Sequence, residues 1–175
     1  MPLNAYLVLN AKGTGVVYKD YKSLYIEKGT VTVISKDSLI HASGDGTKTN
    51  RENAAYEAAL KPVYDEENAL EAKQKAATPE QKNSEAYERE NHKAEKALEA
   101  KESAINKKFM QDNPDSYVSM GALESYAYSA DYADIAPLYN GFSDAIKQSE
   151  EGKAFGDRLP KLKAVAIGAM APEFA

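Results

Sequence analysis

The residue types that could carry chemistry are few and scattered along this chain. His41 and His92 are the only histidines among 175 residues, and neither has a second ligand at metal-binding spacing. There is no cysteine, which excludes disulfides, thiolate metal sites and thiol catalysis. No Gly-x-Ser-x-Gly segment offers a nucleophile elbow. We therefore predict no catalytic residue, no metal ligand, no cofactor and no enzymatic activity for this chain.

Two glycine-containing segments and one acidic run complete the search. Gly13-Thr14-Gly15 and Gly44-Asp45-Gly46 lack the later glycine and the Lys-Ser/Thr pair of a phosphate-binding loop, so we interpret both as turns. Asp65-Glu66-Glu67 lies among helical charges, with no apolar setting to raise a pKa, and is interpreted as a solvated helix face.

Twelve tyrosines without a tryptophan could indicate a sugar or peptide site. However, several of them fall on apolar helical stripes, where a role in the core is commoner. The tyrosines on these stripes are Tyr56, Tyr87, Tyr117, Tyr126 and Tyr139.

Composition limits the class of protein. The chain is 43% apolar and 28% charged, which is ordinary for a globular protein. Its formal net charge of −5 argues against non-specific binding to nucleic acid. No run of about 18 apolar residues occurs, so we expect no membrane insertion by this chain. Met1–Asn4 does not have the pattern of a signal peptide.

The first part, residues 1–48, is predicted to be a small antiparallel sheet of four short strands. Its β-branched and aromatic segments are separated by glycines and by Lys36-Asp37. Gly29, in the segment 27–30, can adopt a positive φ and is typical of a hairpin turn. A sheet of this size needs a helix across one face. The predicted strands are 5–9, 22–27, 30–34 and 38–41.

The second part, residues 49–112, is predicted to be a long antiparallel helical hairpin. Thr49-Asn50-Arg51-Glu52 has the pattern of a capping box, and Thr78-Pro79-Glu80-Gln81 predicts the start of the second helix. Pro62 is expected to kink the first helix without ending it. The remaining faces are highly charged, so we interpret the pair as solvated. A coiled-coil surface that binds a partner is the alternative.

The third part, residues 113–166, is predicted to be a cluster of short helices packed against the sheet. Asn113 is the expected cap of its first helix, with Pro114 in the first turn, and Ser149-Glu150-Glu151 opens its last helix. The fold class is therefore α+β, and residues 167–175 are expected to be a linker.

The C-terminal segment carries a resemblance to a known family. Gly168-Ala169-Met170-Ala171-Pro172-Glu173-Phe174 has the form Gly-x-x-Ala-Pro-x-Phe. It resembles the segment that leads into exported thioredoxin-like domains of the thiol-disulfide oxidoreductase type. The expected thioredoxin-like domain, with its Cys-x-x-Cys helix, would begin after Ala175, so no active residue carries over to this chain.

Upstream segments resemble other parts of the same proteins. Membrane-anchored proteins of Bacteroidetes bacteria have a domain of unknown function ahead of the thioredoxin-like domain. A helical region connects the two domains. Leu24–Gly29, Val31-Thr32-Val33 and Gly46–Asn50 are similar to that domain, and Asn113–Val118 and Ser149–Lys153 are similar to the connecting region.

The resemblance implies a non-catalytic N-terminal accessory module of an extracytoplasmic thiol-disulfide oxidoreductase, in the periplasm or cell envelope. Such a module would position the redox domain or contact substrate proteins. A free-standing scaffold or interaction protein, which binds a partner through its helical hairpin, is the alternative.

The N-terminal strand suggests one further partner. The family's N-terminal domain usually has additional strands ahead of Ala5–Leu9, and this segment carries neither a charge nor a proline that would prevent edge pairing. We therefore expect protein partners and hypothesise a homodimer through the edge of the N-terminal strand.

Overall fold

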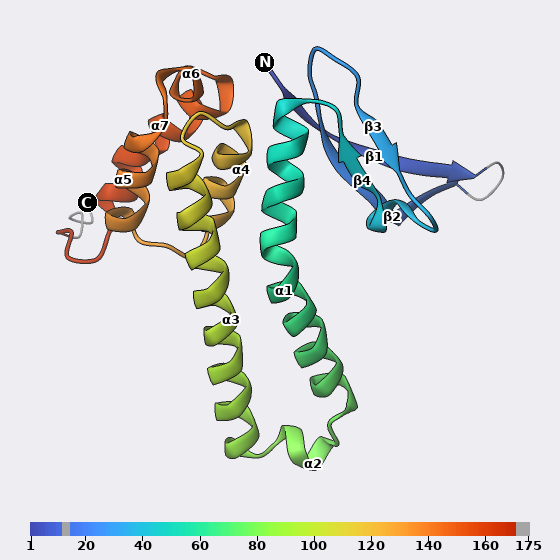
Figure 1. The fold of residues 1–175 in the computed structure, drawn as a ribbon. Helices are drawn as coiled ribbons and strands as arrows, with labels where there is room; N and C mark the ends of the chain where they lie inside the picture. Colours follow the sequence, from blue (N-terminus) through green and yellow to red (C-terminus); the bar gives the residue numbers. More distant parts are fainter. Residues whose placement is uncertain (12–14, 171–175) are drawn as a thin grey trace.

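The computed structural model describes residues 1–11 and 15–170, and its architecture is α+β, as predicted. Strands occupy the N-terminal part, and helices follow from Lys48 onward. In Figure 1 the strands lie on one side of the long helix α1 and the short C-terminal helices lie on the other. Gly13 and Thr14 of the first predicted turn, and the end of the C-terminal motif from Ala171 onward, fall outside the described residues.

The first strand pair is a long antiparallel ribbon. Strand β1 (Leu3–Ala11) pairs with β2 (Gly15–Ile26), with Leu3 opposite Ile26 and Val8 opposite Tyr21. The register is irregular between Val8 and Asn10. The predicted strands 5–9 and 22–27 are therefore both present, and they are partners of each other.

The second strand pair is short and separate from the first. Strand β3 (Thr32–Ile34) pairs with β4 (Ser43–Asp45), so the strands form two pairs rather than the predicted four-stranded sheet. Gly29 has a φ of 136°, as its turn requires, but this turn connects β2 to β3, which are not paired with each other.

The predicted strand 38–41 is instead a single 3₁₀ turn, η1 (Leu39–His41). The Asp37 carboxylate accepts the Ser38 N–H at 2.6 Å, and the Ala42 N–H donates to the Leu39 carbonyl at 2.9 Å. These local hydrogen bonds satisfy the backbone without a strand partner, which is why the extended prediction was wrong.

Helix α1 (Lys48–Ala76) begins one residue earlier than predicted, directly after its N-cap residue Thr47. The capping box at Thr49 and Glu52 does not form, because both side chains bond outside the helix. The Thr49 N–H and hydroxyl donate to the Glu27 carboxylate at 3.0 and 3.1 Å, and the Glu52 carboxylate accepts the Ser116 hydroxyl at 2.6 Å. The helix continues through Pro62, as predicted, and its second half runs at an angle to the first half in Figure 1.

The predicted helical hairpin is present, with one additional element at its tip. The capping box of Thr78 and Gln81 forms at 3.2 and 2.8 Å, but it caps the one-turn helix α2 (Pro79–Lys82). The long helix α3 (Glu85–Asp112) starts after its own cap, Ser84. It returns beside α1 (Figure 1).

Four helices complete the described part of the chain. They are α4 (Tyr117–Tyr126), α5 (Tyr132–Gly141), α6 (Asp144–Lys147) and α7 (Glu150–Ala164). The hydroxyl of Ser149 accepts the Gly152 N–H at 3.0 Å, which confirms the predicted start of α7. Asn113 is not the cap of α4: it ends α3, and Ser116 takes the cap position with its hydroxyl 3.2 Å from the Val118 N–H.

The main core lies among α3, α4, α5, α6 and α7. Its most deeply buried side chains include Met110, Leu123, Ile135, Ile146 and Phe155, each at most 1% exposed. The short helices pack mainly against the base of the hairpin, because α1 lies between them and most of the strands (Figure 1). The predicted packing against the sheet is limited to the ends of β1 and β2, where Asn4 and Tyr25 line a small pocket with α4 and α7.

The tyrosine prediction is confirmed for the core. Four of the five tyrosines on helical stripes belong to this core or pack against it, namely Tyr56, Tyr117, Tyr126 and Tyr139. Tyr87 is half-buried in the hairpin.

Candidate functional site

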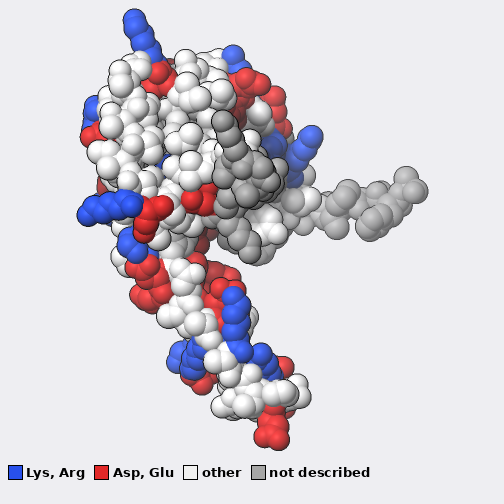
Figure 2. Space-filling model, turned by 90° about the vertical axis from the view of Figure 1, so that its right-hand side faces the viewer, with Lys and Arg blue, Asp and Glu red and all other residues white. Residues whose placement is uncertain are grey.

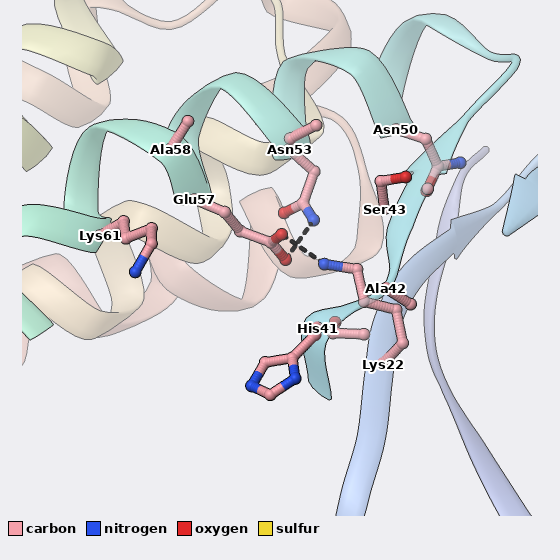
Figure 3. Close-up of a pocket in the computed structure, with 12 residues that line it drawn as sticks. Lys22, His41, Ala42, Ser43, Asn50, Asn53, Glu57, Ala58 and Lys61 are labelled. Atoms are coloured by element: carbon pink, nitrogen blue, oxygen red, sulfur yellow. Dashed lines mark hydrogen bonds and ion pairs between the residues drawn. The ribbon is translucent and has the colours of Figure 1, made fainter. Parts of the chain in front are cut away.

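Polar side chains gather in a small pocket between the strands and the first half of α1 (Figure 3). Its volume is about 250 Å³, which is below the range of most ligand pockets. The strand β2 contributes Lys22 to its lining, η1 contributes His41, and α1 contributes Asn50, Asn53, Glu57 and Lys61.

An ion pair fills one side of this pocket. The Lys22 ammonium donates to Glu57 Oε2, and the Asn53 amide donates to Glu57 Oε1 at 2.9 Å (Figure 3). The Lys22 side chain is 11% exposed, whereas that of Glu57 is 41% exposed. Because the ammonium and the carboxylate neutralise each other, the pair joins β2 to α1 and leaves neither charge for a substrate.

We expect Glu57→Ala to lower the free energy of unfolding by about 2 kcal/mol, because it leaves the mostly buried Lys22 ammonium without a partner. The double variant Lys22→Met, Glu57→Leu should recover most of this loss. Chemical denaturation measures both. The matched control is Lys61→Ala, which breaks the exposed Lys61–Asp65 pair and should change stability by less than about 0.5 kcal/mol. Equal losses for Glu57→Ala and Lys61→Ala would contradict the role of the pair.

Beside the pocket, Ser38, His41 and Asp37 form a cluster that has the residue types of a catalytic triad. The hydroxyl of Ser38 and both carboxylate oxygens of Asp37 lie 3.1 Å from the same ring nitrogen, Nδ1 of His41. A triad needs opposite ring nitrogens for the acid and the nucleophile. The Ser38 backbone N–H, together with the His41 imidazole, lowers the pKa of the Asp37 carboxyl. We interpret the cluster as the local structure of η1.

The histidines and the acidic run do not assemble a metal site. His92 is exposed on α3, and within residues 1–11 and 15–170 no three His, Asp or Glu side chains come together as a metal-ion site. Asp65 and Glu66 pair with Lys61 and Lys101. The pKa of Glu67 is raised by burial and by the charge of Glu102. The expectation that nothing in this run would raise a pKa was therefore wrong for Glu67, which faces the other helix of the hairpin.

The other candidate site is the surface of the β1–β2 ribbon. In the described part of these strands, seven large apolar side chains are between 39% and 67% exposed: Leu3, Tyr6, Leu7, Val8, Leu9, Tyr21 and Ile26. In Figure 2 the charged residues of the upper body lie mainly along its margins, whereas positive and negative residues crowd the hairpin below. Because side chains alternate along a strand, Leu3, Leu7, Leu9 and Ile26 lie on one face of the ribbon, and Tyr6, Val8 and Tyr21 lie on the other.

Exposed apolar side chains grouped in this way mark an interaction site more often than a solvated face.

Sequence reasoning missed the residues that attach this ribbon to α1. Asn50 is 2% exposed; its Oδ1 accepts the Tyr25 N–H at 2.9 Å, and its Nδ2 donates to the Tyr25 carbonyl at 2.7 Å. Its amide therefore takes the place of a neighbouring strand at the outer edge of β2. In the sequence, Asn50 is distinguished only by its position at the start of the predicted helix, and this pattern suggested a capping role for the neighbouring Thr49 instead.

No family model, curated protein or solved structure matches this chain. In the described part of the chain, no helix combines the length and the apolar character needed to cross a membrane.

Proposed function

We propose that this chain is a non-catalytic protein-interaction module that works through the β1–β2 ribbon. The observation that supports it is the exposure of the apolar side chains along both strands, from 39% at Val8 to 67% at Tyr6. The pocket between β2 and α1 offers no comparable surface, since its central charges are already paired.

We further propose that the module is the N-terminal accessory part of an extracytoplasmic thiol-disulfide oxidoreductase. The support is the sequence resemblance of the segment that begins at Gly168. Helix α7 ends at Ala164, and Val165, Ile167 and Met170 are 78%, 87% and 94% exposed, as suits a segment that leaves the core. In this role the ribbon would contact substrate proteins or position the redox domain.

The helical hairpin is a weaker candidate for the interaction surface. Its charged side chains bind across the hairpin, with Lys73 2.8 Å from Glu90 and Lys101 2.5 Å from Glu66. Its buried apolar side chains, among them Leu60, Val63 and Leu98, already face the hairpin interior or base. A partner helix would have to displace contacts that the two helices make with each other.

The coding sequence beyond codon 175 tests the proposed parent. A Cys-x-x-Cys motif within the next several dozen codons supports it, and a stop codon there would overturn it. The 175-residue chain itself should reduce insulin only at the background rate, because without a thiolate no mixed disulfide can form.

The interaction role has its own test in the intact oxidoreductase. Deleting residues 1–164 should lower kcat/KM for a disulfide-bonded protein substrate by roughly tenfold, because the module holds that substrate near the redox site. The kcat/KM for glutathione disulfide should be unchanged, because so small a substrate offers no protein surface to which the ribbon could bind. Equal losses with both substrates would show that the module supports the redox domain rather than substrate binding.

A further inference from the structure

The ribbon has one edge that is occupied and one that is open. At the outer edge of β2, the Asn50 amide bonds both backbone groups of Tyr25, and the Ile40 N–H donates to the Asp20 side chain at 2.9 Å. Within the described residues, the hydrogen-bonded neighbour of β1 is β2 alone. The outer edge of β1 therefore presents a row of unpaired backbone groups over a strand of nine residues.

We infer that the occupant of this edge is a second copy of the chain, paired antiparallel through β1 to give a four-stranded sheet in the order β2, β1, β1, β2. This inference rests on the proposed function, because it uses the same ribbon. It is more specific, since it names the partner and the register.

The composition of β1 supports self-pairing. The strand has no charged residue and no proline, so two copies meet without like-charge repulsion or a missing backbone donor. Its sequence also repeats Leu-Asn-Ala at both ends, at residues 3–5 and 9–11. In an antiparallel pair the two triplets run in opposite directions, so asparagine can lie opposite asparagine and each leucine lies opposite an alanine.

One register brings the two asparagines of the repeat together. If the two-fold axis passes beside Leu7, Asn4 lies opposite Asn10 of the second copy, Tyr6 lies opposite Val8, and Leu7 lies opposite Leu7. Amides then face amides and apolar side chains face apolar side chains on each side of the sheet. Moving the axis to Tyr6 or Val8 places Asn4 opposite Val8, or Asn10 opposite Tyr6, which is less favourable.

Main-chain hydrogen bonds along the two β1 edges would supply the affinity of such a dimer. The apolar side chains next to the second copy are those of β1 itself, namely Leu3, Tyr6, Leu7, Val8 and Leu9, which are 39% to 67% exposed. Tyr21 and Ile26 lie on β2, one strand further away.

The absence of native cysteines makes the register directly testable. In the inferred dimer, two Leu7→Cys side chains lie directly opposite each other, about 5 Å apart, within reach of a disulfide. Two Ala5→Cys side chains lie four residues apart, about 13 Å. Under mild oxidation, Leu7→Cys should form a covalent dimer at least tenfold faster than Ala5→Cys. A mixture of Ala5→Cys and Leu9→Cys should cross-link as a heterodimer.

Light scattering over a concentration series measures the association itself. The unmodified chain should pass from monomer to dimer as concentration rises, and Leu7→Lys should raise the dissociation constant at least about tenfold, because two ammonium groups would then face each other. The control is Ile34→Lys on β3, where the original side chain is 63% exposed and lies outside the inferred interface. Circular dichroism verifies that each variant is folded.

The inference that a second copy occupies the β1 edge would be wrong if the chain stays monomeric at every concentration and Leu7→Cys does not cross-link rapidly. Equal cross-linking of Leu7→Cys and Ala5→Cys would overturn the register and the edge pairing with it. Neither result affects the deletion experiment, which compares a disulfide-bonded protein substrate with glutathione disulfide. Failure of this inference is therefore distinguishable from failure of the proposed function.

Discussion

Asn50→Ala should lower the free energy of unfolding by about 3 kcal/mol, because it leaves two buried backbone groups without hydrogen-bond partners. The Asn50 side chain satisfies both the N–H and the carbonyl of Tyr25, and it also donates to the Thr47 hydroxyl at 2.8 Å. Alanine can replace none of these bonds, and at 2% exposure little water reaches the site.

Urea denaturation with a matched control measures this effect. Asn53→Ala removes an asparagine one turn further along α1, where the amide makes a part-buried hydrogen bond to Glu57. Its cost should be below about 1 kcal/mol. If the two variants lose the same stability, the buried hydrogen bonds of the Asn50 amide do not contribute to the attachment of β2 to α1 as inferred.

Gly152→Ala should cost about 3 kcal/mol or more, because the added methyl group has no space. A Cβ at this position would lie 2.0 Å from the carbonyl oxygen of Ile146 and 2.9 Å from its carbonyl carbon. The obstacle is backbone and cannot rotate away. The carbonyl of Gly152 also accepts the Tyr139 hydroxyl at 2.9 Å, so a shift of α7 would disturb its contact with α5.

Gly141→Ala is the control for this prediction. Gly141 ends α5, and a Cβ built there meets no atom within 4 Å. Its replacement should change the free energy of unfolding by less than about 0.5 kcal/mol, and thermal unfolding of both variants makes the comparison. A small effect of Gly152→Ala would mean that the turn between α6 and α7 relaxes far more easily than its geometry implies.

The elements whose stabilising contacts are local were predicted well. The capping box of Thr78 and Gln81, the cap at Ser149 and the passage of α1 through Pro62 all depend on residues within a few positions of each other. The strands Ala5–Leu9 and Lys22–Glu27 were recognised from their side-chain types alone.

The errors arose where a distant partner competes for a local signal. Thr49 and Glu52 have the pattern of a capping box, but Glu27 and Ser116 bind them instead. The candidate pocket could not be predicted from the sequence, because it also depends on distant partners. Lys22 and Glu57 are 35 residues apart, and neither belongs to a motif. Its residues become neighbours only when β2 docks on α1.

The position of α1 at the centre of the fold has a consequence for folding kinetics. Contacts from its first half reach Lys22 over 35 residues, Asn106 over 50 residues and Ser116 over 64 residues. Such contacts raise the contact order, since a long loop must close before each one forms. Individual helical turns within α1 and α3 require no such closure and can form within microseconds. We therefore expect the slow step of folding to be the docking of β2, α3 and α4 on the first half of α1. Substitutions there should slow folding more than substitutions near the hairpin tip, which stopped-flow refolding measures.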